Sequence, residues 1–110
     1  LVIFRNIEKA LQASITMEKA LRNYNKKKSK EEQVLLCVGL GYGKVLKIGD
    51  NDVYGAEVNA ASKLGEDTAR AGEILVTGSI KEHCNKIPKY KFEEIKTIPP
   101  GAKRAYKLIY

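Results

Sequence analysis

Short apolar runs of strand length alternate with longer segments of helical periodicity, and this alternation limits the possible folds more than any other feature. Helical periodicity extends over residues 6–24 and 56–70, and a shorter helix is expected over residues 78–85. The runs of strand length are residues 34–38, 45–48, 73–77, 90–95 and 105–109, and residues 1–4 resemble the end of a buried strand. This order predicts an α/β (α+β) protein in which helices pack on a mixed sheet.

Capping and apolar spacing refine the two long helices. The first is expected to follow Asn6, which can cap it, and to bury one stripe of side chains: Ile7, Ala10, Leu11, Met17, Leu21 and Tyr24. The second is expected to turn another set of side chains inward: Val58, Ala61, Leu64 and Ala69.

The strands carry pairing signals as well. Residues 34–38 form an unbroken apolar run, which is typical of a strand covered on both faces. Residues 45–48 are expected to pair antiparallel with that strand, with a turn at residues 49–52. The last two strands are expected to pair with each other, because Pro-Pro-Gly at residues 99–101 favours a turn between them.

The composition is that of a folded domain. The chain has 110 residues, 44% hydrophobic and 30% charged, which argues against disorder. No apolar stretch approaches the ~18–20 residues that cross a bilayer. Arg5 interrupts the apolar opening, so no signal peptide is visible and we expect no membrane segment in this chain. The missing initiator Met and the apolar start favour a chain that begins partway through a larger protein.

Cysteine and histidine are too scarce for several kinds of site. Cys37 and Cys84 are too few and too far apart for a disulfide framework or a cysteine-based zinc site. His83 is the one histidine, which disfavours catalysis by a Ser-His or Cys-His pair. We expect both thiols to be reduced, as in a cytoplasmic protein.

The formal net charge of +7 raises nucleic acid as a possible partner. The basic cluster at residues 26–30 runs directly into Glu31 and Glu32, and it lacks the interleaved aromatic residues of a base-stacking surface. A solvated loop is the favoured interpretation, so no nucleic-acid partner is expected. A basic nucleic-acid-binding module stays open as an alternative that a salt titration of binding would test.

Three glycines alternate with other residues at Gly39, Gly41 and Gly43, followed by Lys44. The spacing fits neither a dinucleotide fingerprint nor a P-loop, and Val45 stands where a P-loop has Ser or Thr. We therefore expect these glycines to let the backbone bend or approach another chain closely, rather than to bind phosphate.

The segment after the second turn carries the residues with chemical potential. Asn59 and Lys63 are four residues apart and hence neighbours on one helix face, near the start of the helix. An amide donor, a cation and a helix end together suit charge that develops on a phosphate. From spacing alone, Lys63 can equally be a solvated lysine and Asn59 a satisfied polar group.

Residues 52–64 (DVYGAEVNAASKL), taken with the glycine segment before them, resemble the catalytic domain of class III nucleotidyl cyclases, the adenylate and guanylate cyclase family. The strand at residues 73–77 and the closing pair with Gly101 and Tyr106 resemble the family too. The resemblance extends from Phe4 onward. It implies a ferredoxin-like cyclase fold lacking its N-terminal strands, with residues 1–110 forming the C-terminal part of a single cyclase homology domain.

The resemblance also implies roles for individual residues. Asp52 stands where adenylate cyclases read the adenine amine, which implies ATP, because a carboxylate accepts a hydrogen bond from that amine whereas guanine O6 is itself an acceptor. Asn59 matches the ribose-orienting Asn, and Lys63 replaces the Arg that stabilises the transition-state phosphate. Tyr54 and Lys103 are further candidates for binding substrate.

Two departures leave the activity open. In the family, two Asp residues hold Mg²⁺ or Mn²⁺ and lie upstream of Leu1, so this segment is expected to bind no metal and to be inactive alone. Lys63 keeps the charge of Arg but lacks its planar fork. The leading hypothesis is part of an adenylate cyclase-like domain that converts ATP to cyclic AMP and pyrophosphate at the interface of a homodimer or a related subunit. The alternative is a non-catalytic homology domain for dimerisation or nucleotide sensing.

Overall fold

The computed structural model describes residues 1–49, 52–85 and 87–110, without the side chains of Lys47, Asp52 and Val53. A four-stranded sheet has the order β1 (Val38–Leu40), β4 (Ile74–Thr77), β6 (Ala105–Ile109) and β5 (Lys91–Ile95). The strand β1 is parallel to β4, and the other neighbours are antiparallel. Two further strands, β2 (Leu46–Ile48) and β3 (Asp52–Tyr54), form a separate hairpin. The prediction of a mixed sheet with helices is confirmed.

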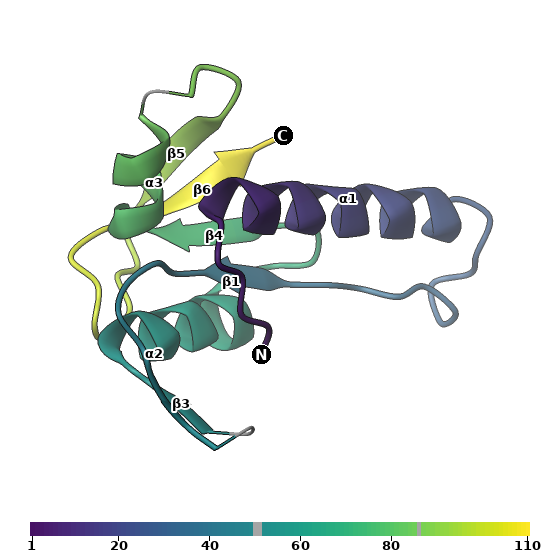
Figure 1. Ribbon diagram of the computed structural model, residues 1–110. Coiled ribbons are helices and arrows are strands. Elements are labelled where there is room, and N and C mark those ends of the chain that lie inside the picture. The colour runs from purple at the N-terminus through teal and green to yellow at the C-terminus, as the bar shows by residue number, and fades with distance from the viewer. Residues whose placement is uncertain (50–51, 86) are drawn as a thin grey trace.

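Helices cover both faces of this sheet (Figure 1). The helices α1 (Ile7–Asn25) and α3 (Gly78–Cys84) lie on one side, and α2 (Ala56–Lys63) lies on the other and continues as the π-helix η1 (Leu64–Thr68). Because successive strand residues point to opposite faces, β4 serves two cores. Ile74 and Val76 pack with α1 and α3, whereas Leu75 packs with Leu64 of η1.

The helix α1 begins as predicted and buries part of the predicted stripe: Ala10 and Leu11 are buried, and Ile7 and Leu21 are half-buried. The Asn6 side chain accepts a hydrogen bond from the Lys9 backbone N–H at 3.0 Å, which confirms the cap. The buried residues follow a 3.6-residue period and are Ala10, Leu11, Ser14 and Glu18. The prediction was wrong for Met17 and Tyr24, which are 47% and 49% exposed, because each lies beside this stripe rather than on it.

The strand predicted at residues 34–38 begins only at Val38. Val34 and Leu35 are 48% and 67% exposed, and Cys37 is exposed as well. The reason is that β1 lies at the edge of the four-stranded sheet and the ladder with β4 begins at the bond from Val38 N–H to the Glu73 carbonyl. Residues 1–4 are likewise exposed and form no strand within the described part of the chain.

Residues 45–48 pair with β3 and not with the strand before them, which corrects the expected partner. Leu46 lies opposite Tyr54, and Ile48 lies opposite Asp52. Gly49 has a φ of 65°, a left-handed conformation that folds the chain back on itself. Asp50 and Asn51, in the middle of the predicted turn, lie outside the described residues.

The predicted helix over residues 56–70 is present, and its last turn is a π-helix in which Ala69 N–H donates to the Leu64 carbonyl at 2.7 Å. Leu64 is fully buried as expected, but Ala60 is the other buried residue, and Val58, Ala61 and Ala69 are half-buried. The strand at residues 73–77, the short helix and the closing strand pair are confirmed, the last with Phe92 opposite Leu108. No helix within the described ranges has both the length and the apolarity needed to cross a membrane.

Candidate functional site

The alternating glycines lie where β1 and the segment after it pack against the helix α2. A Cβ on Gly39 would collide with the Ala61 carbonyl and lie 2.5 Å from the Gly65 amide nitrogen, and both obstacles are backbone. A Cβ on Gly41 would lie 2.6 Å from the Glu57 carbonyl oxygen. The glycines therefore let β1 and the segment after it approach α2 and η1 closely.

Asn59 and Lys63 project from α2, one turn apart. Asn59 N–H donates to the Gly55 carbonyl at 3.1 Å, so Asn59 ends the first turn, whereas Lys63 is the last residue of α2. The N-terminal position expected for both residues therefore holds for Asn59 alone, and the positive end of the helix dipole is remote from Lys63. Both side chains are exposed, and Lys63 Nζ lies 3.2 Å from Asp67 Oδ2.

The other three candidates lie on segments that meet the start of α2. Asp52 and Tyr54 belong to β3, which ends two residues before the helix. Tyr54 is 54% exposed, and the side chain of Asp52 is outside the description. Lys103 is exposed on the loop between β5 and β6, and this loop touches α2, because a Cβ on Gly101 would lie 2.5 Å from the Ala56 carbonyl oxygen. The fold thus gathers these two segments at the start of α2.

Tyr54, Asn59, Lys63 and Lys103 lie on an exposed surface of the single chain. One cavity of about 440 Å³ lies between α1 and the end of β6, and another of about 140 Å³ lies between α1 and the turn before β4. None of these four described side chains lines either cavity. A closed nucleotide site around Asn59 and Lys63 would therefore need a second surface.

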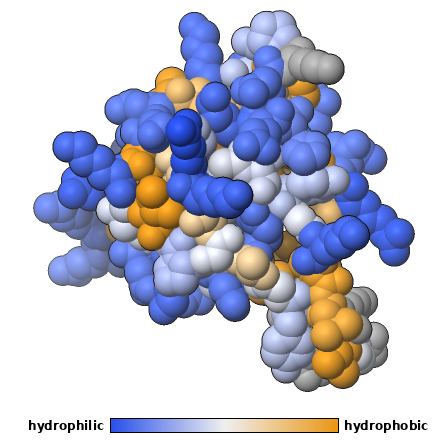
Figure 2. All heavy atoms as spheres, turned by 90° about the vertical axis from the view of Figure 1, so that its left-hand side faces the viewer, coloured by the Kyte–Doolittle hydropathy of each residue, from blue (hydrophilic) through white to orange (hydrophobic). Residues whose placement is uncertain are grey.

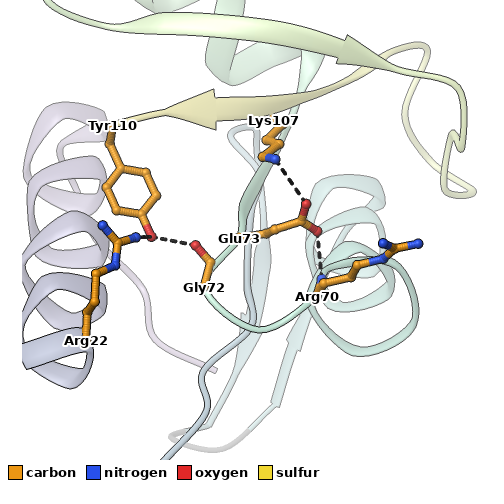
Figure 3. Close-up of polar contacts among 6 residues, drawn as sticks. All are labelled: Arg22, Arg70, Gly72, Glu73, Lys107 and Tyr110. Atoms are coloured by element: carbon orange, nitrogen blue, oxygen red, sulfur yellow. Dashed lines mark hydrogen bonds and ion pairs between the residues drawn. The ribbon is translucent and has the colours of Figure 1, made fainter. Parts of the chain in front are cut away.

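Polar contacts fix the turn that joins η1 to β4 (Figure 3). On one side, the Glu73 carboxylate accepts a hydrogen bond from the Arg70 N–H at 2.8 Å. It also forms an ion pair with Lys107 Nζ at 3.3 Å. The Arg70 N–H is the main cause that lowers the pKa of Glu73. On the other side, Arg22 donates to the Tyr110 hydroxyl at 3.2 Å, and that hydroxyl donates to the Gly72 carbonyl. Sequence reasoning missed this framework, because its partners lie up to 88 residues apart.

Glu18 is the only acidic residue that is buried in the described part of the chain. Its side chain is 4% exposed, and Oε2 has no hydrogen-bond partner among the described residues. Burial raises the pKa of Glu18, and the Arg22 charge one turn along lowers it by less. Above this raised pKa the folded state holds an ionised, unpaired carboxylate.

We predict that Glu18→Gln stabilises the protein at neutral pH by about 1 kcal/mol, because the amide removes a buried charge. The folded-state pKa exceeds the unfolded value near 4.5, so the folded state binds the proton more tightly and wild-type stability falls as pH rises through the folded pKa. The gain should vanish below pH 4.5. Urea unfolding across pH measures it, with the exposed Glu31→Gln as control. Equal pH profiles for wild type and Glu18→Gln would contradict the assignment.

The described residues do not fit a catalytic metal. No group of three or more His, Cys, Asp or Glu side chains in residues 1–49, 52–85 and 87–110 could hold a metal ion.

Comparisons with known proteins agree with this fold. The family described as the adenylate and guanylate cyclase catalytic domain matches residues 2–108. A similar solved structure, described as an adenylate/guanylate cyclase/hydrolase from Silicibacter pomeroyi, superposes with a TM-score of 0.79 at 18% identity. The match covers 97% of this chain and 64% of that one, so this chain spans less than two thirds of its length. No curated protein sequence matches the chain.

At 18% identity the structural likeness establishes the fold, and the family match establishes membership. The cyclase resemblance predicted from residues 52–64 is thereby confirmed. With residues 2–108 matched, the chain belongs to the adenylate and guanylate cyclase catalytic domain family.

Proposed function

We propose that the chain is the C-terminal part of a single adenylate cyclase-like domain that converts ATP to cyclic AMP and pyrophosphate. The observation that carries the proposal is the exposed pair Asn59 and Lys63, one turn apart on α2, in a chain of the cyclase family. The exposed surface around this pair favours a site completed by a second subunit.

In the proposed reaction, the ribose 3′ hydroxyl loses its proton to water, its oxygen bonds to the α-phosphorus, and the bond to pyrophosphate breaks. The Asn59 carboxamide holds the ribose, and the Lys63 ammonium faces the charge that grows on the phosphate oxygens. Lysine supplies this charge as a single point, without the bidentate fork of arginine. Divalent Mg²⁺ or Mn²⁺ is proposed for the complete domain, and this chain's own residues bind and orient the nucleotide.

The proposed base specificity rests on Asp52. Its place on β3, just before α2, suits contact with the base, and a carboxylate accepts a hydrogen bond from the adenine amine. Tyr54 is proposed to pack beside the nucleotide, and Lys103 to reach its phosphates from the loop that contacts Ala56. ATP is therefore proposed in preference to GTP.

The hairpin of β2 and β3 is proposed as a contact surface for the second subunit. It projects from the body of the chain and carries apolar side chains on its surface (Figure 2). Val45, Leu46, Ile48 and Tyr54 are 44–60% exposed, and clustered exposed apolar residues mark interaction surfaces. Because Tyr54 leads into α2, a partner on the hairpin lies close to the nucleotide residues.

We predict that Leu46→Ser weakens self-association about tenfold, because the substitution removes an apolar side chain from a desolvated contact. Sedimentation velocity over a concentration series of the full-length protein measures the dissociation constant. The control is Leu35→Ser, an identical substitution at an exposed leucine outside the hairpin. Equal dissociation constants for Leu46→Ser and wild type would place the interface elsewhere.

A non-catalytic cyclase homology domain is the second candidate function. Lys63 in place of the family Arg, and its ion pair with Asp67, favour it. A cytoplasmic location is proposed for either function, supported by Cys37 and Cys84, which are both free in the structure.

Mass-spectrometric assay of the full-length protein with Mn²⁺ tests the proposal. We expect cyclic AMP from ATP, less cyclic GMP from GTP, and no product from residues 1–110 alone. Nucleotide binding without product would favour the non-catalytic domain. No product at any protein concentration would rule out the enzyme.

A further inference from the structure

The Lys63 ammonium already has an anionic partner in the free chain. Its Nζ lies 3.2 Å from Asp67 Oδ2, four residues further on, where α2 has passed into the π-helix η1. The two side chains are 56% and 58% exposed, so an incoming anion can reach the pair. Asp67 therefore pairs with the same ammonium that the proposed function assigns to a phosphate.

The turn that carries Asp67 is held by packing on both sides. Leu64, its first residue, is fully buried in the core beneath β4. Gly65 lies against β1, since a Cβ on it would be 3.1 Å from the Gly39 amide nitrogen. The bond from Ala69 N–H to the Leu64 carbonyl closes the π turn. Asp67 is thus presented to Lys63 by a packed segment and not by a free loop.

We infer that Asp67 is an internal counter-ion that competes with the nucleotide's phosphates for Lys63 and so sets the affinity of the site. The inference rests on the proposed function, in which Lys63 meets the phosphates. A bound polyphosphate must draw Lys63 from Asp67 and also approach the Asp67 charge. Both effects weaken nucleotide binding, so neutralising Asp67 should strengthen it.

The test is titration calorimetry of the full-length protein with α,β-methylene-ATP, which cannot release pyrophosphate, in the presence of Mg²⁺. An exposed ion pair of this kind is weak, so Asp67→Asn should bind the analogue about two- to fivefold more tightly. The control Glu66→Gln removes the same charge one residue away, from an exposed side chain without an ion pair among the described residues, and should change binding less than twofold. Thermal unfolding of Asp67→Asn should match wild type.

A double-mutant cycle separates competition from general electrostatics. In a Lys63→Ala background, Asp67→Asn should lose most of its effect, because the contested ammonium is absent. Asp67→Asn binding equal to or weaker than wild type, or a gain of full size without Lys63, would overturn the inference while the proposed function stands. If Lys63→Ala binds the analogue as well as wild type, the inference fails, because Lys63 then does not contribute to the affinity for which Asp67 is said to compete. If the wild type binds no analogue, the proposed function fails and the inference falls with it.

Discussion

Lys63→Ala should lower the rate of cyclic AMP formation by the full-length protein about 100-fold, because removal of one well-placed charge donor costs roughly 10²–10³ in rate. The ammonium faces charge that is greatest in the transition state, so the loss should fall mainly on kcat and less on KM. Initial rates measured by mass spectrometry at several ATP concentrations separate the two.

Two matched variants make this result specific to Lys63. Lys63→Arg should keep or raise the rate, since arginine supplies the same charge with two donors. Lys30→Ala removes an exposed loop lysine and should leave the rate unchanged. If Lys63→Ala cyclises ATP as fast as wild type, Lys63 has no part in the chemistry.

Gly39→Ala should destabilise the protein by about 3 kcal/mol, at the upper end of overpacking effects. The added methyl collides with the Ala61 carbonyl and the Gly65 amide, and neither backbone group can rotate away as a side chain could. Relief would require β1 to move from α2 and η1, which would also displace Asn59 and Lys63. Urea unfolding gives the change in free energy.

Gly78→Ala is the matched control, because its Cβ would lie 3.4 Å from the Arg104 Cβ, an ordinary contact. Gly78 begins α3, where alanine is a good helix former, so this variant should be as stable as wild type or more so by up to about 1 kcal/mol. Equal stability of Gly39→Ala and wild type would show that β1 does not pack as closely against α2 and η1 as described.

The elements that sequence reasoning predicted well are those fixed by nearby residues. The start of α1 follows from the Asn6 cap, and the closing pair β5 and β6 follows from two strand-length runs around a Pro-Pro-Gly turn. The mixed sheet follows from the order of helices and strands, which the chain itself carries. These signals act over a few residues and survive without knowledge of tertiary packing.

The errors arise where contacts with residues far away in the sequence decide the local structure. An unbroken apolar run does not reveal whether anything covers it, so residues 34–37 were wrongly expected in a covered strand. Residues 45–48 pair with the strand that follows them because the chain reverses at the left-handed Gly49, so they do not pair with the strand before them. Residues 1–4 were wrongly expected in a buried strand for the reason that applies to residues 34–37: an apolar run does not reveal whether anything covers it.

The site was predictable in part. The four-residue spacing places Asn59 and Lys63 on one face of α2, as expected, but the length of the α-helical part puts Lys63 at its end. The same spacing between Lys63 and Asp67 is a signal for an ion pair that sequence reasoning missed. The contact of Gly39 with Gly65 had no local signal, because 26 positions separate the two glycines in the sequence.

A crystal structure of the full-length protein with α,β-methylene-ATP tests the central claim most directly. We predict that the nucleotide lies between two subunits, with the Asn59 carboxamide at hydrogen-bond distance from the ribose and Lys63 Nζ at hydrogen-bond distance from a phosphate oxygen. A nucleotide bound elsewhere, with both side chains in solvent and away from any shared cavity, would contradict the account.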